Sequence, residues 1–349
     1  MKQRPTDHEQ WRGLYEAMAK IRDLAPWDWM SEHDIFGVQN PETKELGFVS
    51  IMGALGEHFA ISVYLGSHGL YGFLSLFDIP PGEPELFSEY LLEIPQLQAS
   101  FEDHAMLTPQ DLDIVKNLGL SYSGKKAWPL FRSFKPGLFP WYLEPAEIRF
   151  LQYALEQTLD VAPRFKEDPW VIEPGDELLM VRVASKKGNS LVWEDRAMHI
   201  DPPDPDPIDI LLNANAIRSV QRLPQGEQEF EIDVFMYPIP VQEKKGERPF
   251  YPYALMIVDG ETGHVVSVEL LSPKTSLVAM WAEVPNRVLE NLEKLKTLPK
   301  RILVSSDLLY ELLIPVSEEL GFILEAWEEL PNLEDAKYGL LEFLRYRNS

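Results

Sequence analysis

The sequence contains no cysteine, which excludes disulfide bonds, thiolate-bound zinc, iron–sulfur clusters and a cysteine nucleophile. It is also short of positive charge, since 32 Lys and Arg residues against 56 Asp and Glu residues leave a formal net charge of −24. Binding to nucleic acid relies on Lys and Arg side chains that neutralise phosphates, so this balance disfavours DNA or RNA as a partner. Cationic partners, or simple solubility, fit the net charge better.

Long hydrophobic runs are missing as well. No stretch approaches the roughly 18 uninterrupted apolar residues of a membrane-spanning helix. The opening residues, MKQRPTDHEQWRGLYEAM, are polar where a secretory signal requires an apolar segment. We therefore expect a cytoplasmic protein that does not enter a membrane.

The motifs of common enzyme classes are absent. None of the 7 histidines has a second histidine four residues away, the spacing that pairs metal ligands on a helix, and we expect no bound metal. The glycine-rich run 66–72 lies where main-chain amides can hold a phosphate, but it is not G-x-G-x-x-G and no Walker lysine follows. Turn chemistry and close packing explain these glycines. Ser67 and His68 lack the G-x-S-x-G context of a hydrolase.

What is present is enough apolar material for buried cores. The 349 residues and their 45% hydrophobic share predict an α+β protein of two or more domains. Residues 1–165 form the first, a domain of a hairpin plus helices. Its hairpin is expected at 47–53 and 57–65, where β-branched and aromatic residues flank a turn. The other expected elements are helices at 8–24, 70–77, 108–118 and 145–159 and a strand at 96–102.

The most unusual segment is the aromatic and proline-rich stretch 128–141. Its prolines fix turns, and its aromatic side chains need either burial or a partner. They either cap the hairpin sheet or, beside basic residues, form a groove for a peptide or small ligand. The candidate binding residues are Trp128, Phe131, Arg132, Phe134 and Trp141.

A connecting region is predicted over residues 166–226. It contains a hairpin at 178–200, a stiff acidic linker rich in proline at 201–207, and a short helix at 209–220. Residues 227–349 then predict the order β-β-β-α-β-α-β-α, a mixed sheet with helices. The strands are expected at 230–239, 253–258, 264–271, 301–305 and 322–326, and the helices at 277–295, 307–320 and 332–345.

Several signatures in the first half resemble an uncharacterised bacterial domain family. The last third is similar to a second such family that follows the first in the same chains. Relatives are sometimes fused to a cysteine-containing SEC-C motif, which this chain lacks. Neither resemblance implies an activity or a catalytic residue. The signatures are Trp27-Asp28-Trp29, Gly47-Phe48, Tyr64-Leu65-Gly66, and the stretch from Trp128-Pro129 to Pro140-Trp141.

The order of elements from Phe230 to Arg345 is similar to that of ribonuclease-H-like folds. In those folds, acids on the first strand, the first helix, the end of the fourth strand and the last helix hold two divalent metals for phosphodiester cleavage. Ser306 and Asp307 are equally explained as an N-cap. The acids that this resemblance implies are Asp233, Glu290 (or Glu283), Asp307 and Asp335.

The lack of any specific catalytic motif favours a non-catalytic protein-binding or scaffolding role. Its partner would be a protein or a peptide, and no cofactor is expected. A divalent-metal-dependent nuclease is the alternative, and a small-molecule sensor or hydrolase that uses the 66–72 turn is the third. The sequence leaves the oligomeric state open.

Overall fold

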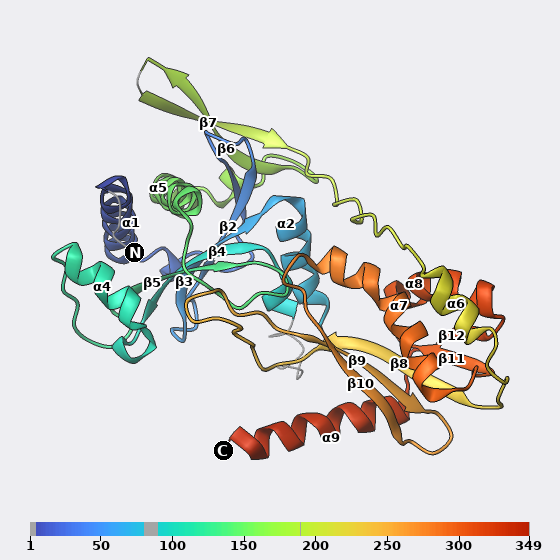
Figure 1. The fold of residues 1–349 in the computed structure, drawn as a ribbon. Helices are drawn as coiled ribbons and strands as arrows, with labels where there is room; N and C mark the ends of the chain where they lie inside the picture. Colours follow the sequence, from blue (N-terminus) through green and yellow to red (C-terminus); the bar gives the residue numbers. More distant parts are fainter. Residues whose placement is uncertain (1–4, 80–89, 189, 349) are drawn as a thin grey trace. The chain divides into compact units, whose positions relative to one another are not determined.

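The computed structural model describes residues 5–79, 90–188 and 190–348. The chain forms two compact units, each with its own sheet (Figure 1). Unit 1 comprises residues 1–136 and 140–204, and unit 2 comprises residues 137–139 and 205–349. The predicted α+β class is confirmed.

Unit 1 is built on a seven-stranded sheet in the order β5-β4-β3-β2-β1-β6-β7. Neighbouring strands are antiparallel except β1 and β6, which are parallel. The expected hairpin is confirmed as β2 and β3. The strands are β1 (Phe36–Gln39), β2 (Leu46–Met52), β3 (Phe59–Leu65), β4 (Gln96–Glu102), β5 (Trp128–Phe134), β6 (Leu179–Lys187) and β7 (Ser190–Met198).

Alternating side chains of this sheet serve two cores on opposite faces. Val49 and Val63 pack in a large core with α1 and α5, whereas their neighbours Phe48 and Tyr64 pack in a smaller core with α2. The helices of unit 1 are α1 (Pro5–Leu24), α2 (Gly66–Ser75), α4 (Pro109–Asn117) and α5 (Pro145–Glu167), with short 3-10 turns at η1 (Pro26–Asp28), η2 (Leu76–Asp78), η3 (His104–Met106) and η4 (Pro169–Ile172).

Several details of unit 1 differ from the sequence-based expectation. Strands β1 and β5 were not foreseen. β5 carries Pro129, which is tolerated because β5 is an edge strand and needs no ladder bond on its outer side. Helix α5 continues past its expected end to Glu167, and α2 begins at Gly66 without a side-chain cap from Ser67. The helix expected at 108–118 is confirmed as α4, and the Thr108 side chain caps it by accepting from the Asp111 amide.

The β6–β7 hairpin is fixed at its base by charged groups. Arg182 of β6 is buried and donates to Gln157 of α5 (2.9 Å) and Asp195 of β7 (2.6 Å). Arg164 of α5 also pairs with Asp195. Burial pushes the pKa of the Asp195 carboxyl up, but the hydrogen bonds from Arg164 and Arg182 outweigh it and hold the pKa below its ordinary value. Beyond Arg182, β6 pairs only with β7.

Unit 2 contains a five-stranded sheet in the order β10-β9-β8-β11-β12. Strands β8, β11 and β12 are parallel, and β9 runs antiparallel to β8 and β10. The expected order of strands and helices is confirmed, although α6 starts later than expected. The elements are α6 (Ala214–Val220), β8 (Glu229–Met236), β9 (Tyr253–Asp259), β10 (Val265–Leu271), α7 (Leu277–Leu295), β11 (Arg301–Val304), α8 (Asp307–Leu320), β12 (Ile323–Ala326) and α9 (Pro331–Asn348).

Helices α7 and α9 lie on opposite faces of the unit 2 sheet (Figure 1). On one face, Ser267 and Glu269 of β10 hydrogen-bond with Asn291 of α7. On the other, Met256 of β9 packs in a small core with Leu333 of α9. Within the described residues, no helix is both long and apolar enough to cross a membrane.

Candidate functional site

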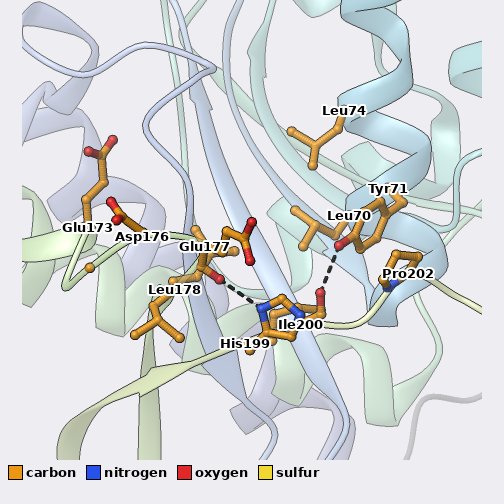
Figure 2. A pocket seen from close by; sticks show the side chains of 12 residues that line it. Leu70, Tyr71, Leu74, Glu173, Asp176, Glu177, Leu178, His199, Ile200 and Pro202 are labelled. Atoms are coloured by element: carbon orange, nitrogen blue, oxygen red, sulfur yellow. Dashed lines mark hydrogen bonds between the residues drawn. The ribbon is translucent and has the colours of Figure 1, made fainter.

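A pocket of about 680 Å³ lies in unit 1 between α2 and the loops at the base of the β6–β7 hairpin (Figure 2). Helix α2 supplies apolar side chains to one wall, and the loop before β6 supplies acids to the other. Its lining residues are Leu70, Tyr71, Leu74, Glu173, Gly175, Asp176, Glu177, Leu178, Leu179, His199, Ile200 and Pro202.

Two hydrogen bonds join the walls of this pocket (Figure 2). The Tyr71 hydroxyl donates to the carbonyl of Ile200 (2.8 Å), which ties α2 to the segment after β7. The Nδ1 atom of His199 lies 3.1 Å from the carbonyl oxygen of Glu177. A carbonyl only accepts, so Nδ1 is the donor of this bond, and Nε2 lies 3.4 Å from an Asp201 carboxylate oxygen.

The acids of the loop before β6 form what we call the acidic rim: Glu173, Asp176 and Glu177. All three are exposed, and among the described residues none of them makes an ion pair. Glu177 has a φ of 58°, in the left-handed region that residues with a side chain rarely adopt. Its carbonyl bond to His199 helps to hold this conformation. The rim is therefore negatively charged and conformationally fixed at Glu177.

Unit 2 contains two buried carboxylates, and both serve helix α9. Glu231 and Asp233 lie on the face of β8 that α9 covers. Glu231 accepts from the Asn332 side chain (3.1 Å) and from the Leu333 amide (2.8 Å), so it caps the first turn of α9. Asp233 accepts from its neighbouring amide (2.8 Å) and pairs with Lys337. All four carboxylate oxygens are thus occupied.

The acids implied by the ribonuclease-H-like resemblance are not gathered. Asp233 is held by Lys337, and Glu290 pairs with Arg287 on its own helix. Asp307 and Asp335 are exposed at the starts of α8 and α9. In the parts of the chain that the structure describes, no three His, Asp or Glu side chains form a group that could hold a metal ion. Glu283, the alternative acid on this helix, also pairs with Arg287.

The aromatic stretch 128–141 is largely engaged within unit 1. Phe131 is 3% exposed and meets the Tyr15 ring edge-on at 5.0 Å. Trp128 packs against His104 at 4.8 Å, and Trp141 hydrogen-bonds with β5 through its main chain. Phe134, which ends β5, is half-buried. Phe131 is thus buried, and Trp128, Phe134 and Trp141 are partly buried.

Arg132 makes the strongest polar contact of this stretch. Its guanidinium donates two hydrogen bonds to the Asp111 carboxylate (2.9 and 2.7 Å) and lies 5.0 Å from the Tyr142 ring centre. Asp111 is itself part of the α4 capping box, so the pair links β5 to the start of α4.

Replacing Arg132 with methionine should therefore lower the stability of unit 1 by about 2 kcal/mol, because the buried Asp111 carboxylate loses its counter-charge. Chemical denaturation followed by tryptophan fluorescence measures this loss. Lys116→Met, at the exposed end of α4, is the control with the same charge change. Equal losses in the two variants would show that the pair does not stabilise α4.

The sequence did not predict this pocket, because its two walls lie far apart in the chain. Its acids lie in the predicted connecting region 166–226, before the expected hairpin, and α2 approaches them from about a hundred residues earlier.

Comparison with known families matches both parts of the chain. Residues 11–182 match a domain of unknown function, DUF7309, and residues 216–341 match a second domain of unknown function, DUF6930. A comparison with curated proteins gives no match. The first domain covers most of unit 1, and the second lies within unit 2. The chain therefore combines two regions that match domains of unknown function, DUF7309 followed by DUF6930.

Proposed function

We propose that this protein is a non-catalytic binding protein whose unit 1 pocket receives a positively charged side chain of a protein or peptide partner. The observation that carries the proposal is the pocket itself, which is lined by the acidic rim on one side and by α2 on the other. Its volume of about 680 Å³ lies within the range of ordinary ligand sites.

The chemistry of the two walls suits a lysine or an arginine. Both side chains have an aliphatic stem that can lie against Leu70 and Leu74, and both carry a cationic head that can meet the rim. No Lys or Arg is among the residues that line the pocket, so an incoming cation has no competitor there. Exposed ion pairs alone contribute little, so the apolar contact is needed for affinity.

Two further observations support a non-catalytic role. Ser, Thr, Cys and Lys, which usually act as nucleophiles, are absent from the pocket lining. In unit 2, the buried Glu231 and Asp233 have every carboxylate oxygen engaged by α9 or by main chain. Lys337 places a positive charge beside Asp233, where a nuclease would need a metal ion.

Fluorescence anisotropy with a labelled Lys- and Arg-rich peptide tests this function. The triple variant Glu173→Gln/Asp176→Asn/Glu177→Gln should weaken binding about tenfold, because it removes the charge of the rim and keeps its shape. The charge-matched control changes three exposed acids of α1 and should leave binding unchanged: Glu9→Gln/Glu16→Gln/Asp23→Asn.

An acidic peptide of equal length is the second reference and should not bind. If the rim variant and the α1 control bind the basic peptide equally, attraction comes only from the overall charge and the pocket is not the site. A rise in salt should weaken the specific complex as well, since the rim is exposed.

A further inference from the structure

The β6–β7 hairpin carries opposite charges at its two ends. At the turn between the strands, Lys186 and Lys187 are exposed and form what we call the basic tip. At the other end, β6 starts beside the acidic rim and β7 ends at Met198, next to His199. Figure 1 shows the hairpin extending away from the rest of its sheet. A basic tip is unusual in a chain with a net charge of −24.

The basic tip cannot reach the pocket of its own chain. β6 runs from Leu179, in the pocket wall, to Lys187, and this length of extended strand spans roughly 25 Å. The contacts of Arg182 with Gln157 and Asp195 fix the base of the hairpin, so it does not fold back. The basic tip and the acidic rim of the pocket are therefore oppositely charged and lie at the two ends of the β6–β7 hairpin.

We infer that the partner whose cation enters the pocket is a second copy of this chain, through its basic tip. This inference rests on the proposed function. Two hairpins that lie antiparallel place each tip at the base of the other, so both contacts form at once and the assembly closes as a two-fold dimer. Successive strand residues point to opposite faces, so one of the two lysines faces the partner's rim.

The charges of the tip and the rim are complementary. One lysine of the tip meets the acids of the rim, and its aliphatic stem lies against Leu70 and Leu74. The overall negative charge opposes association at long range. At physiological salt that repulsion is screened beyond about 8 Å, whereas the tip and the rim act in direct contact.

Sedimentation velocity over a range of protein concentrations, with a charge swap between tip and rim, tests this dimer. The tip variant Lys186→Glu/Lys187→Glu and the rim variant Glu173→Lys/Asp176→Lys/Glu177→Lys should each raise the dimer dissociation constant about tenfold or more. A mixture of the two should associate again, because the acidic tip of one fits the basic rim of the other. Circular dichroism confirms that both variants are folded.

Restored association in the mixture cannot come from a loss of folding or from net charge, so it would establish the contact. The inference is wrong if the unaltered chain stays monomeric at every concentration, or if the mixture does not associate. Binding of the basic peptide distinguishes failure of the dimer from failure of the proposed function. If the chain binds the peptide but does not self-associate, the dimer is wrong and the proposed binding site stands. If it neither binds the peptide nor self-associates, both are wrong.

Discussion

Replacing Lys337 with methionine should lower the stability of unit 2 by about 3 kcal/mol, because it leaves a buried carboxylate without its cation. Asp233 is 6% exposed, and the Lys337 ammonium group lies 4.8 Å from the Phe235 ring centre, so the variant loses a cation–π contact too. Urea denaturation measures the global effect. Hydrogen exchange of the α9 peptides measures whether that helix detaches first.

Two further variants make this prediction specific. The double variant Asp233→Asn/Lys337→Met removes both charges and should recover much of the lost stability. Lys294→Met changes an exposed lysine of α7 and should have little effect. If Lys337→Met is no more destabilising than Lys294→Met, the pair is not what holds α9 on the sheet.

Replacing Gly69 with valine should lower the stability of unit 1 by about 3 kcal/mol and disturb the pocket. A Cβ atom at this position would lie 2.7 Å from the Tyr64 carbonyl carbon and 2.9 Å from the Pro95 carbonyl oxygen. Both are main-chain atoms, near the end of β3 and just before β4, so they cannot rotate away. Helix α2 must shift, and Leu70 in the pocket wall moves with it.

Gly72→Ala is the matched control on the same helix. Its Cβ would meet only the Ile94 side chain, at 3.2 Å, which can adjust by a small movement. Thermal unfolding and basic-peptide binding should both change for Gly69→Val and hardly at all for the control. Equal behaviour of the two variants would show that close approach at Gly69 does not position α2.

Local signals predicted most of the regular structure. The cap at Thr108, the left-handed glycine at Gly321 and the hairpin turn between β9 and β10 mark element ends through interactions within a few residues. All of the residues that make up such a signal are close together in the sequence. The order of elements in unit 2 could therefore be predicted before its sheet was known.

What could not be predicted depends on contacts far apart in the chain. β1 is four residues long, and it is a strand because β2 and β6 flank it. Asp233 was considered as a metal ligand for the same reason. No residue near it in the sequence indicates its partner Lys337, which lies 104 residues later. The pocket combines α2 with a loop about a hundred residues further on, and its walls meet only in the folded unit.

The dependence of β8 on α9 also constrains how unit 2 is made on the ribosome. Glu231 accepts from a main-chain amide 102 residues further along, so its partner is synthesised long after the strand itself. During that interval, water must solvate Glu231 and Asp233, and the central strand cannot be covered on that side. Synthesis of the last helix is thus the event that allows this side of the sheet to close.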